Sequence, residues 1–175
     1  MPPPRWNLVP DSRLAPLSRD QRYFEYAEAY LDSAARLCAV LARSTRKANF
    51  QRGAVVLYLV QHALELFYKG AVIRKAPKER LVHGIPLLRT RYLKLYPGKA
   101  FLIQPTFVPS YENLTKDQIE QVKGSEPPGD QIFRYPETKG GTPWEGLFAF
   151  EASSFYREIT ALKNDFTRVR QAINA

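Results

Sequence analysis

The two histidines of the chain are its best candidates for proton transfer near neutral pH. His62 shares a predicted helix, about residues 50 to 75, with Glu65 and Lys69. Because an α-helix rotates by about 100° per residue, these three side chains project within one arc of roughly 100°. Glu65 and Lys69 are also i,i+4 partners in the favourable order. We expect a structural salt bridge or a dimer contact for this pair, or else a ligand-facing pair that works with His83.

Each histidine also has a structural interpretation. His62 is flanked by apolar positions, which favours a hydrogen-bonded residue of the core or of an interface. His83 precedes a predicted third helix, and we expect it to hold that loop against the second helix. The alternative for His83 is catalysis, with Lys78, Arg80 or Arg89 as the cation near a phosphate.

Metal and cofactor chemistry has little support in the sequence. One cysteine and two histidines are too few for a structural zinc site, which needs four N or S ligands at close spacing. The chain has no Gly-rich phosphate loop and no nucleophile elbow. Cys38 lies on the apolar face of a predicted helix, which indicates a small buried hydrophobe. We therefore predict no metal and no cofactor.

The net charge of +9 is unevenly spread. Residues 43–52 carry four basic groups and no acid, and residues 69–99 carry nine basic groups against Glu79 alone. This asymmetry favours a polyanion partner, RNA or DNA. The alternatives are solvated faces, and cations placed at helix ends by the helix dipole. The predicted nucleic-acid contacts are Arg74, Lys75, Arg89, Arg91, Lys94 and Arg134.

Arg134 belongs to a predicted aromatic cluster with Tyr135 and Trp144. These rings could stack on bases, but local packing and cation–π pairing explain them as well. The two basic stretches flank opposite ends of a helix about 35 Å long. The two stretches should therefore form two separate basic patches, or a single patch only where two chains meet in a dimer.

Apolar spacing predicts helices along most of the chain. Residues 1–18 are rich in proline and should form an extended arm. Ser18 caps a first helix, 19–44, with acidic Asp20 in its first turn. Asn49 caps the second, 50–75, whose first half is apolar all round and marks it as the central helix. Pro86 opens the third helix as its first residue, and the turn at 96–98 ends it.

The later part of the chain is less regular. Thr115 and Gln118 suggest a capping box for a short helix that Gly124 closes. Segments 131–135 and 144–150 could pair as a hairpin, and a last helix covers 151–172. The predicted fold class is all-α: residues 19–175 form one up-and-down antiparallel four- to five-helix bundle, with a small β-hairpin or irregular insertion before the last helix.

Neither a secretory signal nor a membrane span is expected. No apolar stretch follows the first five residues, and the longest unbroken apolar run, 54–60, is far shorter than a bilayer is thick. We expect a soluble, cytoplasmic protein with no membrane partner.

Two motifs resemble the HEPN superfamily. They are the segment AVVLYLVQHALELFYKGAVI at 54–73, with its Glu-x-x-x-Lys step, and HGIPLL at 83–88, which opens the next helix. The resemblance covers about residues 19–97. It implies an antiparallel four- to five-helix bundle, often dimeric. Many members of the family are metal-independent ribonucleases or toxins of defence and toxin–antitoxin systems, and others bind nucleic acid without cutting it.

The Arg/His motif of the family's nucleases is absent. An arginine would have to precede a histidine by four to six or so residues, but Val, Val and Leu stand at 55–57 and Ala, Pro and Lys at 76–78. Lys78 precedes His83 at the spacing of the motif, but it is a lysine where the motif has arginine. His83, Lys78 and Arg80 are therefore only weak catalytic candidates.

The sequence thus favours a non-catalytic, HEPN-like binding or regulatory module. We expect a homodimer that binds nucleic acid, RNA in particular, or a protein encoded nearby. The alternatives are an atypical HEPN ribonuclease toxin, and a protein–protein interaction domain with no nucleic-acid role.

Overall fold

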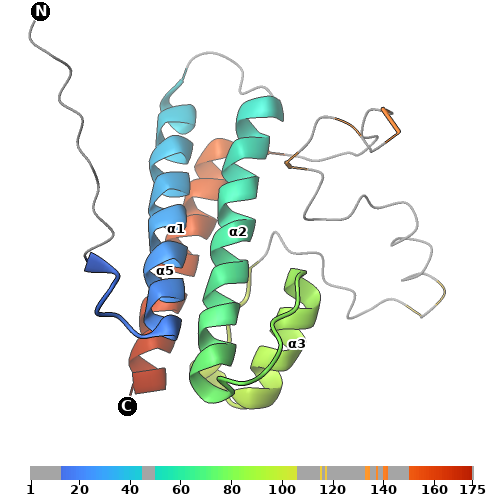
Figure 1. Ribbon diagram of the computed structural model, residues 1–175. Helices are drawn as coiled ribbons and strands as arrows, with labels where there is room; N and C mark the ends of the chain where they lie inside the picture. Colours follow the sequence, from blue (N-terminus) through green and yellow to red (C-terminus); the bar gives the residue numbers. More distant parts are fainter. Residues whose placement is uncertain are drawn as a thin grey trace, which may run out of the picture.

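A computed structural model describes residues 13–44, 50–105 and 150–174, together with positions 115, 117, 133, 134, 137, 140 and 141. Its helices are α1 (Arg19–Arg43), α2 (Phe50–Lys75), α3 (Ile85–Leu95) and α5 (Ala152–Asn174), with a 3-10 turn, η2 (Lys99–Phe101) (Figure 1). The described part is mostly helical, as the all-α prediction requires. Most of the predicted arm, the Asn49 cap, the Thr115 capping box with its short helix, and most of the hairpin lie outside the described residues.

The helix boundaries follow local sequence signals closely. Ser18 is the N-cap of α1: its N–H donates to Gln21 Oε1 at 2.9 Å, and its hydroxyl donates to Asp20 Oδ1 at 2.6 Å. The bounds of α2 are those predicted. Pro86 is one residue further into α3 than predicted, because Gly84 is the N-cap and Ile85 the first residue. α5 ends two residues beyond the predicted 172.

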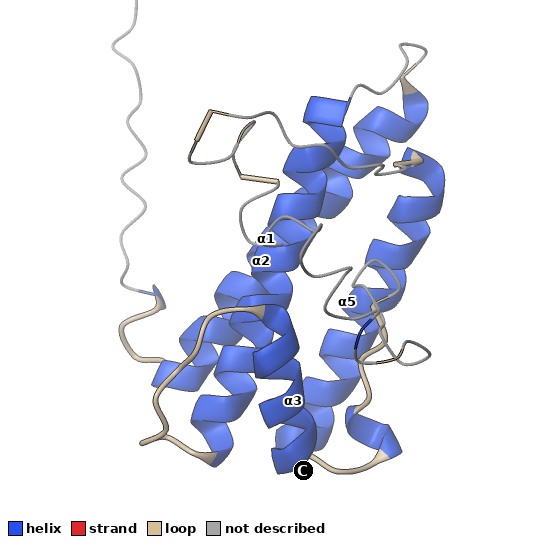
Figure 2. Ribbon diagram, turned by 90° about the vertical axis from the view of Figure 1, so that its right-hand side faces the viewer, coloured by secondary structure: helices blue, strands red, loops and turns tan. Residues whose placement is uncertain are grey.

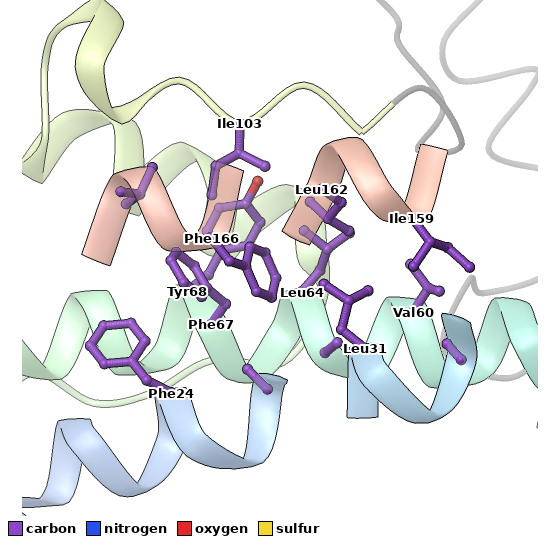
Figure 3. Close-up of a cluster of buried hydrophobic side chains, with 14 of the residues drawn as sticks. Phe24, Leu31, Val60, Leu64, Phe67, Tyr68, Ile103, Ile159, Leu162 and Phe166 are labelled. Atoms are coloured by element: carbon purple, nitrogen blue, oxygen red, sulfur yellow. The ribbon is translucent and has the colours of Figure 1, made fainter. Parts of the chain in front are cut away.

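The most deeply buried helix is α2. Its core-facing side chains from Val56 to Val72 pack against α1 and α5, and Phe67 contacts aromatic rings from both (Figure 3). Ring centroids are 3.9 Å apart for Phe67 and Phe166, and 5.1 Å apart for Phe67 and Phe24. By length and composition α2 could also cross a membrane, but 67% of its most apolar window is buried within the bundle. This is the pattern of a core helix in a soluble protein.

The helices do not simply alternate in direction. α1 is antiparallel to α2, since Asp20 at the start of α1 pairs with Arg74 at the end of α2 at 3.4 Å. α5 is parallel to α2, because two contacts follow in the same order along both helices. Phe166 lies against Phe67, and about two turns later in each helix Asn174 accepts a hydrogen bond from Arg74. At the other end Phe150, which precedes α5, packs on Gly53, where a Cβ would lie 2.8 Å from Phe150 Cγ.

α3 is also parallel to α2. The Tyr92 ring lies 5.0 Å from that of Tyr68, and the Tyr96 hydroxyl donates to the Ala71 carbonyl at 3.0 Å. Residues 76–84, here called the return segment, run back along α2 so that α3 starts near its middle (Figure 2). The prediction of an up-and-down antiparallel bundle is therefore wrong for α3, which runs parallel to α2 because the chain reverses once after α2 and again at the start of α3. The parallel course of α5 and α2 is that of the fourth and second helices in such a bundle.

Side chains also fix the segment after α3. The Arg168 guanidinium donates to the Leu102 carbonyl at 2.6 Å and to the Ala100 carbonyl, and it pairs with Asp165. The Tyr92 hydroxyl donates to the Phe101 carbonyl at 2.5 Å. These bonds attach η2 to α5 on one side and to α3 on the other.

The single cysteine is buried where α1 meets the start of α5. Cys38 is inaccessible to solvent, and its thiol lies 3.2 Å from the Ala152 carbonyl as a donor. Burial, helped by the charge of Glu151, raises its pKa to about 11. A thiol that stays protonated in the core agrees with the prediction of a small buried hydrophobe.

We predict that Glu151, the residue before α5, makes a pH-dependent contribution to the stability of the fold. Hydrogen bonds from the Ser154 side chain and from the N–H groups of Ser153 and Ser154 lower the pKa of Glu151 from 4.5 to about 2. A depressed folded-state pKa means that the stabilisation is complete above about pH 4.5 and is lost as the pH falls toward 2. Glu151→Gln should therefore lower Tm at neutral pH, and the difference from wild type should shrink in acid. Thermal unfolding followed by circular dichroism checks this, and a difference that is constant with pH would contradict it.

Candidate functional site

Four polar or aromatic residues form one line along the mostly apolar middle of α2. Tyr58, His62, Glu65 and Lys69 follow one another at steps of four, three and four residues, which places them along a single line on a helix. We call this line the polar stripe. The stripe interrupts the apolar surface of the most buried helix. Its polar groups therefore need hydrogen-bond or ion-pair partners to offset the cost of burial.

Glu65 is the centre of the stripe. Its Oε1 lies 2.5 Å from Lys69 Nζ and 3.1 Å from His83 Nδ1, and Lys69 Nζ is 3.5 Å from the same histidine nitrogen. Lys69 is only 8% exposed. Glu65 therefore neutralises a nearly buried ammonium group and also anchors the return segment on α2.

Glu65 is charged in this setting. Burial raises the pKa of its carboxyl, but the hydrogen bond and charge of Lys69, with the bond from His83 and the charge of His62, outweigh burial and lower it. When His83 carries its proton on Nδ1, it donates to Glu65 and leaves Nε2 as an acceptor. The His83 side chain is 88% exposed, so this second nitrogen is open to a ligand.

His62 lies between two tyrosines. The Tyr30 ring meets it edge-on with centroids 4.6 Å apart, and the Tyr58 ring is nearly parallel to it at 5.9 Å. Burial lowers the pKa of His62, and the charges of Lys69 and Arg134 lower it further against the opposing charge of Glu65. The imidazole is therefore neutral at neutral pH. Arg134 lies over the Tyr58 ring, 5.8 Å from its centroid.

Three of the predicted nucleic-acid contacts support the fold. Arg74 bridges Asp20 and Asn174 at 3.4 Å each. Arg91 pairs with Glu79 at 3.1 Å and donates to the Arg80 carbonyl at 2.8 Å, which fixes the return segment on α3.

Arg89, the third of them, lies near the buried hydroxyl of Tyr68. Burial raises the pKa of that phenol, and the arginine charge opposes the rise. Three arginines that looked like phosphate contacts in the sequence thus have neighbours within the protein.

Other cations of the same region are exposed and unpaired. In the part of the chain that the structure describes, no carboxylate pairs with the charged groups of four residues on the end of α2, the return segment and α3: Lys75, Lys78, Arg80 and Lys94. Of the other basic stretch, the described residues Arg43 and Arg52 lie at the end of α1 and in the first turn of α2, far along α2 from Lys75 at its last residue.

The residues around His83 bear on two kinds of chemistry, metal binding and proton transfer. Among the described residues, no group of three or more His, Cys, Asp or Glu side chains could hold a metal ion. His83 shares the return segment with Lys78 and Arg80, but the direct partners of its imidazole are Glu65 and Lys69. The geometry therefore offers an imidazole oriented by Glu65, to which no arginine of the described residues donates a hydrogen bond.

Sequence reasoning found His62, Glu65, Lys69 and His83 but missed the two tyrosines. Tyr58 could have been found, because it continues the i, i+4, i+7, i+11 spacing of the stripe by one step back. Tyr30 could not, since it reaches His62 from another helix. Arg134 contacts Tyr58 of α2, and its predicted neighbours Tyr135 and Trp144 lie outside the described residues.

We predict strong coupling between Glu65 and Lys69. Glu65→Leu leaves a nearly buried ammonium group without its counter-charge, which should lower the free energy of unfolding by about 3 kcal/mol. The double variant Glu65→Leu/Lys69→Met removes both charges and should lose less than the single variant. Urea unfolding of wild type, both single variants and the double variant measures this. Losses that simply add would show that the pair does not act as a unit.

Comparison with protein-family models, with curated proteins and with solved structures finds no match to this chain.

Proposed function

We propose that this chain is a non-catalytic nucleic-acid-binding module with a HEPN-like fold, and that its partner is RNA. The observation that carries the proposal is a set of exposed cations for which the described part of the chain holds no carboxylate partner: Lys75, Lys78, Arg80 and Lys94. They lie on consecutive elements around the end of α2, where Glu79 is the only acid of the sequence from 69 to 99.

Phosphate backbones suit such a surface. Exposed lysines and arginines without internal partners can release the counterions of a nucleic acid, which provides most of non-specific affinity. Arg74 and Arg91 keep their internal pairs and hold the scaffold on which these cations stand. The division between paired and unpaired cations distinguishes this surface from a uniformly solvated one.

The remaining parts of the proposal depend on the resemblance at 54–73 and 83–88. Members of that family are often homodimers, and many act in defence or toxin–antitoxin systems. We extend these properties to this chain, with a cytoplasmic location, as part of the same proposal.

The affinity for RNA should depend steeply on salt. Lys78→Ala and Lys94→Ala should each reduce the slope of log affinity against log salt concentration by about one, because each removes one phosphate contact. Fluorescence anisotropy with a labelled single-stranded RNA measures both quantities.

Lys163→Ala is the matched control, since Lys163 of α5 is paired with Asp32 of α1. It should leave the slope unchanged. Absent binding, or binding that does not vary with salt, would refute the nucleic-acid role and favour a protein partner instead.

One observation favours a second candidate function, a metal-independent ribonuclease. Glu65 holds His83 by Nδ1 and leaves an exposed imidazole nitrogen, which is the arrangement of a general base oriented by a carboxylate. A cation directed at the phosphate would have to come from Lys78 or Arg80, because Lys69 is nearly buried and bonded to Glu65.

His83→Gln tests this candidate. Glutamine can still donate to Glu65, but it cannot transfer a proton, so RNA cleavage should fall by about 10²- to 10⁴-fold while RNA binding persists. Cleavage of a labelled RNA in the presence of a metal chelator gives the rate, with Lys163→Ala as the control, since Lys163 is paired with Asp32. No cleavage by wild type, or full activity of His83→Gln, would exclude this function.

A further inference from the structure

Tyr58 and His62, the N-terminal half of the polar stripe, take no part in the ion cluster of Lys69 and His83 or in the proposed phosphate contacts. Tyr58 and His62 are only partly buried, and their ring planes lie within 6° of each other. The Tyr30 ring packs against the imidazole nearly at right angles, with 4.6 Å between the centroids. Together they form a small aromatic surface one turn from Glu65.

Glu65 has an acceptor to spare beside this surface. Its Oε1 already receives Lys69 and His83, which uses both lone pairs of that oxygen. Within the described ranges Oε2 accepts no hydrogen bond, and His62 Nδ1 lies 4.0 Å from it, which is too far for one. The carboxylate, 18% exposed, can therefore accept one more donor from a ligand.

The two features suit the same ligand. A flat aromatic group would stack on Tyr58 and His62, and an N–H donor at its edge would reach Oε2. Exocyclic amino groups of adenine, cytosine and guanine are such donors, whereas uracil has a carbonyl oxygen in that position. The return segment, which His83 attaches to Glu65, also carries the exposed cations Lys78 and Arg80, which can bind phosphates of the same strand.

We infer that the polar stripe receives one unstacked nucleobase, which lies against Tyr58 and His62 and donates its exocyclic amino group to Oε2 of Glu65. This inference rests on the proposed RNA-binding function and names the element of RNA that the site reads. Single-stranded RNA presents such bases, and duplex RNA does not.

The test compares short oligocytidine with oligouridine, two pyrimidine strands of equal charge. Wild type should bind oligocytidine about tenfold more tightly, as one hydrogen bond to a charged group predicts. Tyr58→Leu should weaken binding of oligocytidine by about 5- to 100-fold, the usual range for one stacked base, and leave binding of duplex RNA unchanged. Tyr156→Leu, which alters an exposed tyrosine of α5, is the matched control and should change neither.

Equal affinity for the two strands, or unchanged binding of oligocytidine by Tyr58→Leu, would overturn the inference while RNA binding itself stands. If wild type binds no RNA, the proposed function fails, and a titration with cytidine and uridine monophosphates then decides the site. NMR shifts of the His62 ring that appear with the cytidine nucleotide alone would uphold the nucleobase site. An absence of shifts, or equal shifts with both nucleotides, would overturn it.

Discussion

The structure depends on one constraint, which is that α2 is apolar on nearly every side and has to be covered. No single partner helix can cover it, so α1 packs on one side, α5 closes the core through Phe166, and α3 covers the C-terminal half. The stacking of Phe67 between rings of α1 and α5 lies at the centre of this arrangement. Each remaining element takes its place according to which part of α2 is still exposed.

The polar stripe is the exception in this helix, and its charges are paired within the fold. An ammonium group as buried as that of Lys69 requires a counter-charge, and Glu65 supplies it one turn away. The same carboxylate lies 3.1 Å from His83 Nδ1 and so attaches the return segment to α2. Because the His83 side chain is 88% exposed, this contact adds little stability. The burial of Leu88, Tyr92 and Tyr96 against the rest of the core is what holds α3 parallel to α2.

The same connection holds the segment that carries Lys78 and Arg80. His83 attaches the return segment to Glu65 of α2, while Arg91 holds it from the α3 side through Glu79. The cations of residues 69–99 divide into arginines that bond to other parts of the protein and exposed cations for which the described part of the chain holds no carboxylate partner. These exposed cations, and the partly buried rings of Tyr58 and His62, are the features from which the two proposals for RNA recognition derive.

By itself the sequence determined the class and the limits of the elements. Apolar spacing, the Ser18 cap and the proline positions gave α1, α2 and α5 to within two residues, because these signals act between residues close in the chain. It also identified Glu65 and Lys69, which are one helical turn apart. Only the tertiary structure decided the parallel course of α3, the contact of His83 with Glu65, and the tyrosines around His62. Those features depend on contacts between segments distant in the sequence, and local propensity and spacing carry no information about which of several such contacts buries α2 best.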